Sequence, residues 1–542
     1  MSNSDQNPSS GGDNEAEQPV PTLPWERKPS IFDHIVAHIQ SGELDDDGED
    51  LPDEERVTEG SGIRWAAGAR DGVATHHMVG TEQDQATALL KLVVDYCGAP
   101  SSENKLKVYE QVVQNPIARV IDPFIKGLRQ ETGMDLYRFY DLAKSLVLDA
   151  TDREPVKLGI AVLGLFRQET DKAIFRTLGR HDEFTLFCAV ALANSEGDTE
   201  QELWELAKHV HGWGRIHVVE RLAETADPQI KDWLLREGYK NSVMNEYLAY
   251  TCATGGGLLA ALENEDIDAE LLASSGGIVK ALLSVDGPAG NIDSYDDGAA
   301  VVAHYLKHLT ARASTVPEFL VAVAVRGFLA DDEADWDDRA SRGWTPEVRA
   351  ALLEQCDEVV KMPLWRQLVQ TDLRSSDEQA FSDANQAASA LGIDTWDYHW
   401  ERVQAEPLES GRWFYVMEDC GVHHVDEVVA LAEKSLPLAN IAQGPAKEHG
   451  QEAEHEPHRC LDFILQGLRP HPGHGGGLIE IGLRSPVVRN RHGALKVLAA
   501  WGQPNWPEGM EHRLAEALDR EPDDKVRESI QKVIDGENMD GE

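Results

Sequence analysis

The feature that most constrains the fold is a unit of two amphipathic helices that recurs about every thirty residues. Three such pairs follow one another between 171 and 253, and their second members begin near 182, 213 and 241. One pair cannot bury its apolar faces alone, so consecutive pairs have to stack. We therefore predict an all-α fold, an irregular α-solenoid of stacked helix pairs.

Local signals support these helices. Asp227 followed by Pro228 is typical of an N-cap with proline at the first helical position, and Gly238 is typical of a helix end. In the second helices of the first and third pairs, apolar residues recur at i, i+3, i+4, i+7 and i+8, which places them on one stripe of a helix. The stripes are Phe184, Phe187, Cys188, Ala191 and Leu192, and Met244, Tyr247, Leu248, Thr251 and Cys252.

Two segments near the C-terminus share an opening. Residues 485–501 begin Ser-Pro-Val-Val-Arg, and residues 523–534 begin Asp-Asp-Lys-Val-Arg. These openings resemble the second helix of HEAT-like repeats, and the pairs between 171 and 255 resemble it more loosely. The resemblance implies a HEAT- or armadillo-like array, a class that usually serves as a binding scaffold. It carries almost no information about a particular function.

A second resemblance covers residues 179–259. The segments GRHDEFTLFCAVALANS, GWGRIHVVERLAET and IKDWLLREGYKNSVMNEYLAYTCATGGGL are similar to parts of bacterial proteins labelled limonene hydroxylase. This resemblance implies an oxidoreductase that oxidises a monoterpene with a nicotinamide cofactor. It offers no catalytic motif to transfer to this chain.

Composition divides the rest of the chain. Segments rich in Ser, Asn, Gly, Pro and Glu bury too little apolar surface to fold, and acidic runs are usually solvated. The expected order is a disordered tail at 1–30, N-terminal helices at 31–100 with an acidic loop at 43–60, a helical repeat array at 101–330, an acidic linker at 331–345, a helical region at 346–442, a His- and Gly-rich segment at 443–477, C-terminal HEAT-like helices at 478–536 and a tail at 537–542.

Charge limits the partners. The chain carries 96 acidic and 50 basic residues, a formal net charge of −46. Such a field repels phosphate backbones and anionic lipid surfaces, so we expect neither nucleic acid nor a membrane as partner. Two explanations of the acidity remain open. One is solubility in a high-salt cytoplasm, and the other is a protein partner of basic or mixed charge.

The cysteines and the N-terminus indicate a cytoplasmic protein. Six cysteines are scattered singly, without a CxxC pair, which is typical of free thiols in a reducing compartment. The first residues have neither the basic nor the apolar region of a signal peptide, and no apolar run approaches the ~20 residues that span a bilayer.

The sequence contains no recognisable motif for binding a nucleotide cofactor. The glycine clusters at 254–258, 274–278 and 471–478 lack the G-x-G-x-x-G spacing, and no P-loop occurs. We therefore predict no cofactor, and we interpret the clusters as helix connections.

Histidines are the best candidates for metal chemistry. His455, His458 and Cys460 lie within six residues, and imidazole and thiolate are suitable ligands for zinc or iron. These three are the candidate metal ligands, although their spacing matches no zinc motif and a solvated polar loop is the alternative. The i, i+4 pairs His34–His38 and His304–His308 could each present two imidazoles on one helix face, and the alternatives for each are a metal site and a surface or partly buried pair.

The predicted function is a non-catalytic scaffold whose helical surface binds another protein. Two alternatives remain. One is the monoterpene oxidation implied by the limonene hydroxylase resemblance, and the other is a metal-dependent activity of the histidines at 449–474.

Overall fold

The computed structural model describes residues 23–58, 64–77, 82–284, 287–450, 453–537 and 539. In these residues nearly all regular structure is helical, with 31 α-helices. The strands found there are β1 (Ile39–Gln40) and β2 (Glu43–Leu44), which pair antiparallel. The prediction of an all-α fold is confirmed. None of the described helices is long and apolar enough to cross a membrane.

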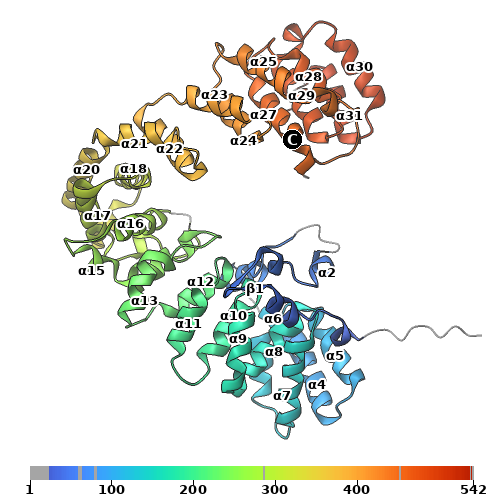
Figure 1. Cartoon of the computed structure of the whole chain (residues 1–542), viewed down its shortest axis with the longest axis vertical. Coiled ribbons are helices and arrows are strands. Elements are labelled where there is room, and N and C mark those ends of the chain that lie inside the picture. The colour runs from blue at the N-terminus through green and yellow to red at the C-terminus, as the bar shows by residue number, and fades with distance from the viewer. Residues whose placement is uncertain are drawn as a thin grey trace, which may run out of the picture. The chain divides into compact units, whose positions relative to one another are not determined.

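The chain forms two compact units, and Figure 1 labels most of their helices. Unit 1 comprises Met1–Ala313 and Val321–Val360, and unit 2 comprises Ser314–Leu320 and Lys361–Glu542. Helix α18 (Val316–Ala330) begins in unit 2 and ends in unit 1.

The other helices of unit 1 range from 5 residues in α2 to 16 in α4. They are α1 (Ile31–His38), α2 (Glu54–Thr58), α3 (Ala69–His77), α4 (Gln83–Gly98), α5 (Ser102–Val113), α6 (Ile117–Leu128), α7 (Leu136–Asp149), α8 (Arg153–Phe166), α9 (Lys172–Leu178), α10 (Asp182–Ala193), α11 (Thr199–Ala207), α12 (Trp213–Val219), α13 (Pro228–Trp233), α14 (Ala249–Gly256), α15 (Leu258–Leu262), α16 (Ala269–Leu282), α17 (Gly298–Arg312), α19 (Trp336–Ser341) and α20 (Pro346–Val360).

Unit 2 contains the remaining helices. They are α21 (Leu364–Asp372), α22 (Glu378–Leu391), α23 (Trp396–Ala405), α24 (Ser410–Glu418), α25 (Val425–Ser435), α26 (Leu438–Ile441), α27 (Glu456–Leu468), α28 (Gly476–Leu483), α29 (Val488–Trp501), α30 (Met510–Arg520) and α31 (Asp524–Ile534).

In unit 1 the second members of successive pairs pack against one another. Helix α10 lies between α8 and α12, and its predicted stripe from Phe184 to Leu192 is buried. The starts of α10 and α12 agree with the predicted starts near 182 and 213. In the third pair, the second helix starts later than predicted, because α14 begins only at Ala249. The side chain of Asn241 accepts hydrogen bonds from the backbone of Val243 and Met244, and this local turn replaces the expected first helical turn.

A similar order recurs in unit 2, where α24 packs on α27, α27 on α29, and α29 on α31. The two C-terminal helices lie where the Val-Arg openings placed them. Asp523 caps α31, since its carboxylate accepts from the backbone N–H groups of Lys525 and Val526. The apolar faces of these helices form one continuous core.

The acidic segment at 43–60 is not the solvated loop that was predicted. Within its described part, up to Thr58, Leu51 is 3% exposed and Asp53 is 5% exposed. Leu51 anchors the segment by apolar burial, and Asp53 by an ion pair with Arg153. The predicted tail at 1–30 is also too long. Residues 1–22 lie outside the described residues, but Trp25 already packs its ring 6.0 Å from that of Tyr109.

Two further predicted connections contain helices. The predicted linker at 331–345 includes α19 and the buried Trp344. The predicted loop around the late histidines was wrong for 456–468, which form α27. Leu461, Ile464, Leu465 and Leu468 repeat at helical spacing there and are fully buried, a pattern that the surrounding His and Gly residues obscured. Of the predicted tail at 537–542, only Glu537 and Met539 are described.

His399 on α23 makes the stability of unit 2 depend on pH. The side chain is 3% exposed, its Nε2 lies 2.8 Å from Asn385 Oδ1, and burial lowers its pKa to about 4. Below the ordinary pKa of about 6.5, the unfolded chain takes up a proton that the folded chain refuses. Stability should therefore fall between about pH 6.5 and 4, by up to about 1.4 kcal/mol per pH unit from this group.

The check is the free energy of unfolding of wild type and His399→Gln in urea between pH 7 and 5. Tryptophan fluorescence monitors the unfolding. The variant should lose less stability on acidification than wild type. His512→Gln, at an exposed position on α30, should behave as wild type. Equal pH slopes for all three proteins would contradict the prediction.

Candidate functional site

Three cavities adjoin one another on unit 1 and define the candidate site. Their volumes are about 190, 220 and 280 Å³, and Ala66 lines all three. Residues 43–57 and 64–70 form one wall, and the starts of α8 and α10 with the residues before α12 form the other. A cavity of about 510 Å³ in unit 2 has no aromatic lining residue.

Acidic residues in the first turns of α8 and α10 contribute to this wall. Carboxylates are favourable there, because the first N–H groups of a helix lack intrahelical partners and its N-terminus carries partial positive charge. Asp182 reaches the next pair, since its carboxylate accepts from the backbone N–H groups of Gly212 at 3.0 Å and Gly214 at 2.9 Å. The start of α10 is thereby tied to the start of α12.

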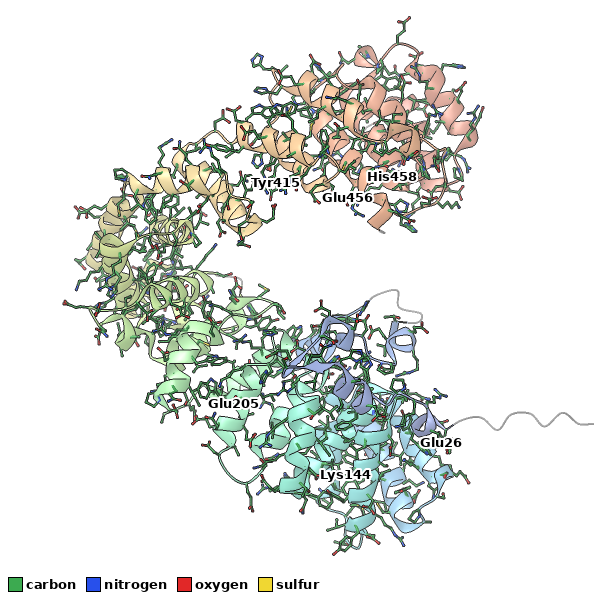
Figure 2. The ribbon with its side chains drawn as sticks, viewed as in Figure 1. Glu26, Lys144, Glu205, Tyr415, Glu456 and His458 are labelled. Atoms are coloured by element: carbon green, nitrogen blue, oxygen red, sulfur yellow. The ribbon has the colours of Figure 1, made fainter. Side chains whose placement is uncertain are left out.

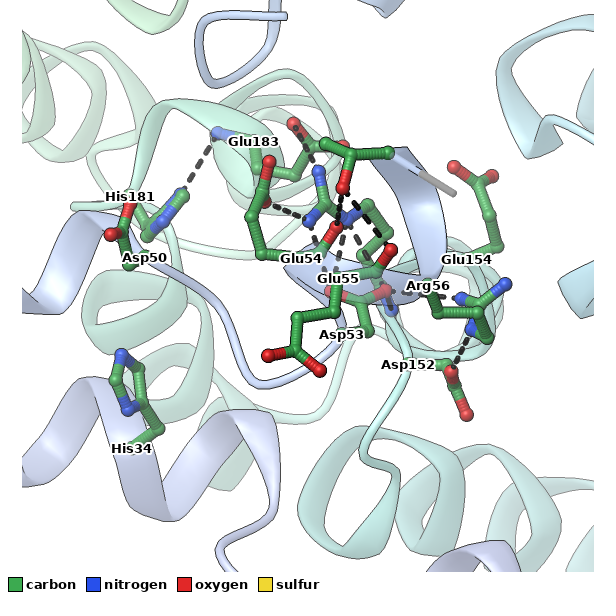
Figure 3. A network of polar contacts seen from close by, with 12 residues as sticks. His34, Asp50, Asp53, Glu54, Glu55, Arg56, Asp152, Glu154, His181 and Glu183 are labelled. Carbon is green, nitrogen blue, oxygen red and sulfur yellow. Dashed lines mark hydrogen bonds and ion pairs between the residues drawn. The ribbon is translucent and has the colours of Figure 1, made fainter. Parts of the chain in front are cut away.

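The described part of the acidic segment, residues 43–58, is held down by the start of α8, as Figure 3 shows in part. The Arg153 guanidinium donates to Asp53 Oδ1 from Nε at 3.1 Å and from Nη2 at 3.0 Å, and Nη2 also donates to Glu54 at 2.6 Å. Arg56 in turn donates to Asp152 at 2.7 Å (Figure 3). Charge-assisted bonds of this kind fix the wall of the cavities.

Lys157 lies beneath this wall and is fully buried. Its Nζ is 2.6 Å from Asp71 and from Glu183, and 3.1 Å from Glu154. Although burial alone would lower the pKa of Lys157, these three carboxylates hold it well above the ordinary value. One buried ammonium therefore joins α3, α8 and α10.

Burial and neighbouring charges set the protonation of the site. Burial raises the pKa of Asp182 to about 6 and lowers that of His181 to about 4. Burial would also raise the pKa of Glu183, but Lys157 and Arg153 hold it at about 2. Lys157, Arg153 and the Gly68 N–H occupy the Glu183 carboxylate, so we interpret the network as structural.

The rim of the cavities is more accessible than their floor. Trp65 is 49% exposed and lines two of the three cavities, together with charged side chains that include Glu54 and Arg64. Tryptophan and arginine are side chains that protein interfaces favour.

The predicted metal ligands lie on α27 and just before it, and each contacts a different partner. His458, labelled in Figure 2, is buried, and its Nδ1 lies 2.8 Å from Asn490 Oδ1 and 3.0 Å from Ser485 Oγ. His455 pairs with Glu448 at 3.2 Å, and the buried Cys460 thiol faces the carbonyl of Pro407. A metal at these three residues stays a prediction.

The other histidine pairs contact the backbone. His38 Nδ1 lies 2.8 Å from the carbonyl of His34, and the buried His308 places Nε2 2.9 Å from the carbonyl of Leu262.

Sequence reasoning missed one cluster. Among the described residues, His76, His217 and Glu220 form a group whose possible ligand atoms all lie within 4.8 Å of one another. His217 and Glu220 are three apart on one helical turn, and this spacing was the available signal. The third member comes from α3, a neighbour that only the fold identifies.

Comparison with known proteins returned no match to a family model and no significantly similar curated protein. The resemblances to HEAT-like repeats and to proteins labelled limonene hydroxylase therefore remain expectations from the sequence.

Proposed function

We propose that this chain is a HEAT-like α-solenoid scaffold, which binds another protein at the three adjoining cavities of unit 1. The packing of α8, α10 and α12 in chain order supports the solenoid arrangement, as does the order α24, α27, α29 and α31 in unit 2. In a repeat array each helix pair contacts its neighbours in the chain, which leaves an extended surface for a partner.

The observation that carries the proposal is the exposed Trp65 at the rim of two cavities. Its ring offers a large contact area, and the salt-linked walls are already ordered, so little freedom is lost on binding. The net charge of −46 favours a partner of basic or mixed charge and disfavours nucleic acid and anionic membranes. We place the protein in the cytoplasm, because all six cysteines are free thiols.

The alternative functions receive less support. Residues 179–259, which resemble proteins labelled limonene hydroxylase, include α10, α12 and α14, whose residues contribute to helix packing. No observation on these residues favours monoterpene oxidation or a catalytic use of the histidines at 449–474.

The test is quantitative co-purification from native cells with full-length wild type, Trp65→Ala and Tyr137→Ala. Tyr137 is the matched control, an exposed aromatic residue on α7 outside the cavities. A partner should be recovered with wild type and with Tyr137→Ala. Trp65→Ala should bind it about 30-fold more weakly, the effect expected for an interface hot spot. Equal recovery by all three proteins would move the interface elsewhere, and no partner at all would contradict the scaffold.

A further inference from the structure

Two imidazoles and one carboxylate converge on the side of unit 1 where α3 packs against α12. His76 lies in the last turn of α3, His217 in α12, and Glu220 begins the 3-10 turn (Glu220–Leu222) that continues α12. His76 Nε2 is 3.7 Å from Glu220 Oε1, and the possible ligand atoms of all three residues lie within 4.8 Å of one another.

The close approach of α3 to α12 depends on Gly72. A Cβ atom at this position would lie 2.1 Å from the indole ring of Trp213, so the two helices can meet only where α3 carries no side chain. His76 is one helical turn after Gly72, and His217 is one turn after Trp213. The two imidazoles therefore face each other, with ring centroids 5.6 Å apart.

His217 carries a polar atom that the surrounding protein does not satisfy. The side chain is 3% exposed, and its Nε2 finds no hydrogen-bond partner among the described residues. Buried nitrogen atoms are nearly always bonded, and an exception needs an explanation. Trp213 packs its ring 6.3 Å from that of His217, but such a contact leaves Nε2 unsatisfied. A bound cation would give the Nε2 atom of His217 the partner that it lacks among the described residues.

We propose that His76, His217 and Glu220 bind a divalent transition-metal ion, with Zn²⁺ as the ion that fits best. Two histidines and a glutamate are a known zinc ligand set, and the fourth position of a tetrahedral site then stays open to water. Ligand atoms in such a site are about 3.4 Å apart, so the side chains contract modestly around the ion. The 36% exposure of Glu220 leaves a path for the ion, and the acidic chain attracts cations.

This proposal is independent of the protein-binding proposal, since none of the three residues lines the cavities around Trp65. Either proposal can fail without the other.

The test uses the full-length protein after chelator treatment, titrated with Zn²⁺ against a chromogenic chelator. Wild type should bind a single tight Zn²⁺, and Co²⁺ in its place should show the visible absorption of a tetrahedral site. His217→Ala and Glu220→Gln should each weaken Zn²⁺ at least ~100-fold, because loss of even an outer-shell group weakens metal binding 10–100-fold. Zn²⁺ should raise the melting temperature of wild type and leave those of the variants unchanged.

His455→Ala is the matched control, because it removes a histidine of the cluster that the sequence favoured. It should bind Zn²⁺ like wild type. Loss of the tight site in His455→Ala, or equal affinity of wild type and Glu220→Gln, would overturn the proposal. Circular dichroism of each variant shows that the fold is retained, and Glu220→Gln, a substitution of a partly exposed residue, keeps the test decisive if His217→Ala does not fold.

Discussion

Replacing Lys157 with methionine should destabilise unit 1 by about 3–5 kcal/mol, the cost of removing one partner from a buried ion pair. Methionine fills most of the space of the lysine stem but leaves the carboxylates of Asp71, Glu154 and Glu183 without the central cation. Buried carboxylates without a nearby cation repel one another and lack the solvation of water. Urea unfolding at pH 7 measures the effect.

The sign of the pH dependence separates this mechanism from a simple loss of packing. Without Lys157 the buried carboxylates should have raised pKa values and bind protons more tightly in the folded state than in the unfolded state. The stability of Lys157→Met should therefore rise relative to wild type as the pH falls from 7 to 5. Lys107→Met, which breaks an exposed pair with Glu103, should leave the unfolding midpoint unchanged. A Lys157→Met deficit that is independent of pH would indicate packing alone.

The sequence predicted the helices of this region but not the ion network. Phe184, Phe187 and Leu192 repeat at helical spacing, and spacing along one helix is enough to predict a buried stripe. The partners of Lys157 come from α3, α8 and α10, and among 96 acidic residues no pattern singles out Asp71 or Glu183. Such pairing is decided by tertiary packing, which a local sequence signal cannot contain.

The acidic segment at 43–60 illustrates the same limit. Its composition predicted a solvated loop, because charged residues usually remain in water. Asp53 is buried nonetheless, since Arg153 offers it hydrogen bonds from two side-chain nitrogen atoms and from its backbone N–H. Residues 43–57 of this segment line the cavities, so the candidate site could not be predicted from composition. Trp65 was likewise indistinguishable in the sequence from a tryptophan of the core.

Arg491 in unit 2 is a buried cation like Lys157, but it pairs with one carboxylate instead of three. The side chain is 1% exposed, and it contacts Glu521 through Nε and Nη2, each at 2.8 Å. Nη1 donates to the carbonyls of Ser485 and Pro486, and Nη2 also donates to the carbonyl of Ala446. All five N–H groups are thereby used, which ties α29 to the segments around it.

Arg491→Met should destabilise unit 2 by about 3–5 kcal/mol, because Glu521 stays buried without its cation and three backbone carbonyls lose their donor. Arg491→Lys should recover only part of the loss, since an ammonium has three donors and cannot form the two-pronged contact. The double variant Arg491→Met/Glu521→Met should be more stable than Arg491→Met, because it removes the isolated charge. Arg513→Met, at an exposed position on α30, serves as control and should unfold like wild type. A double variant that is no more stable than Arg491→Met would contradict the role assigned here to the isolated charge of Glu521.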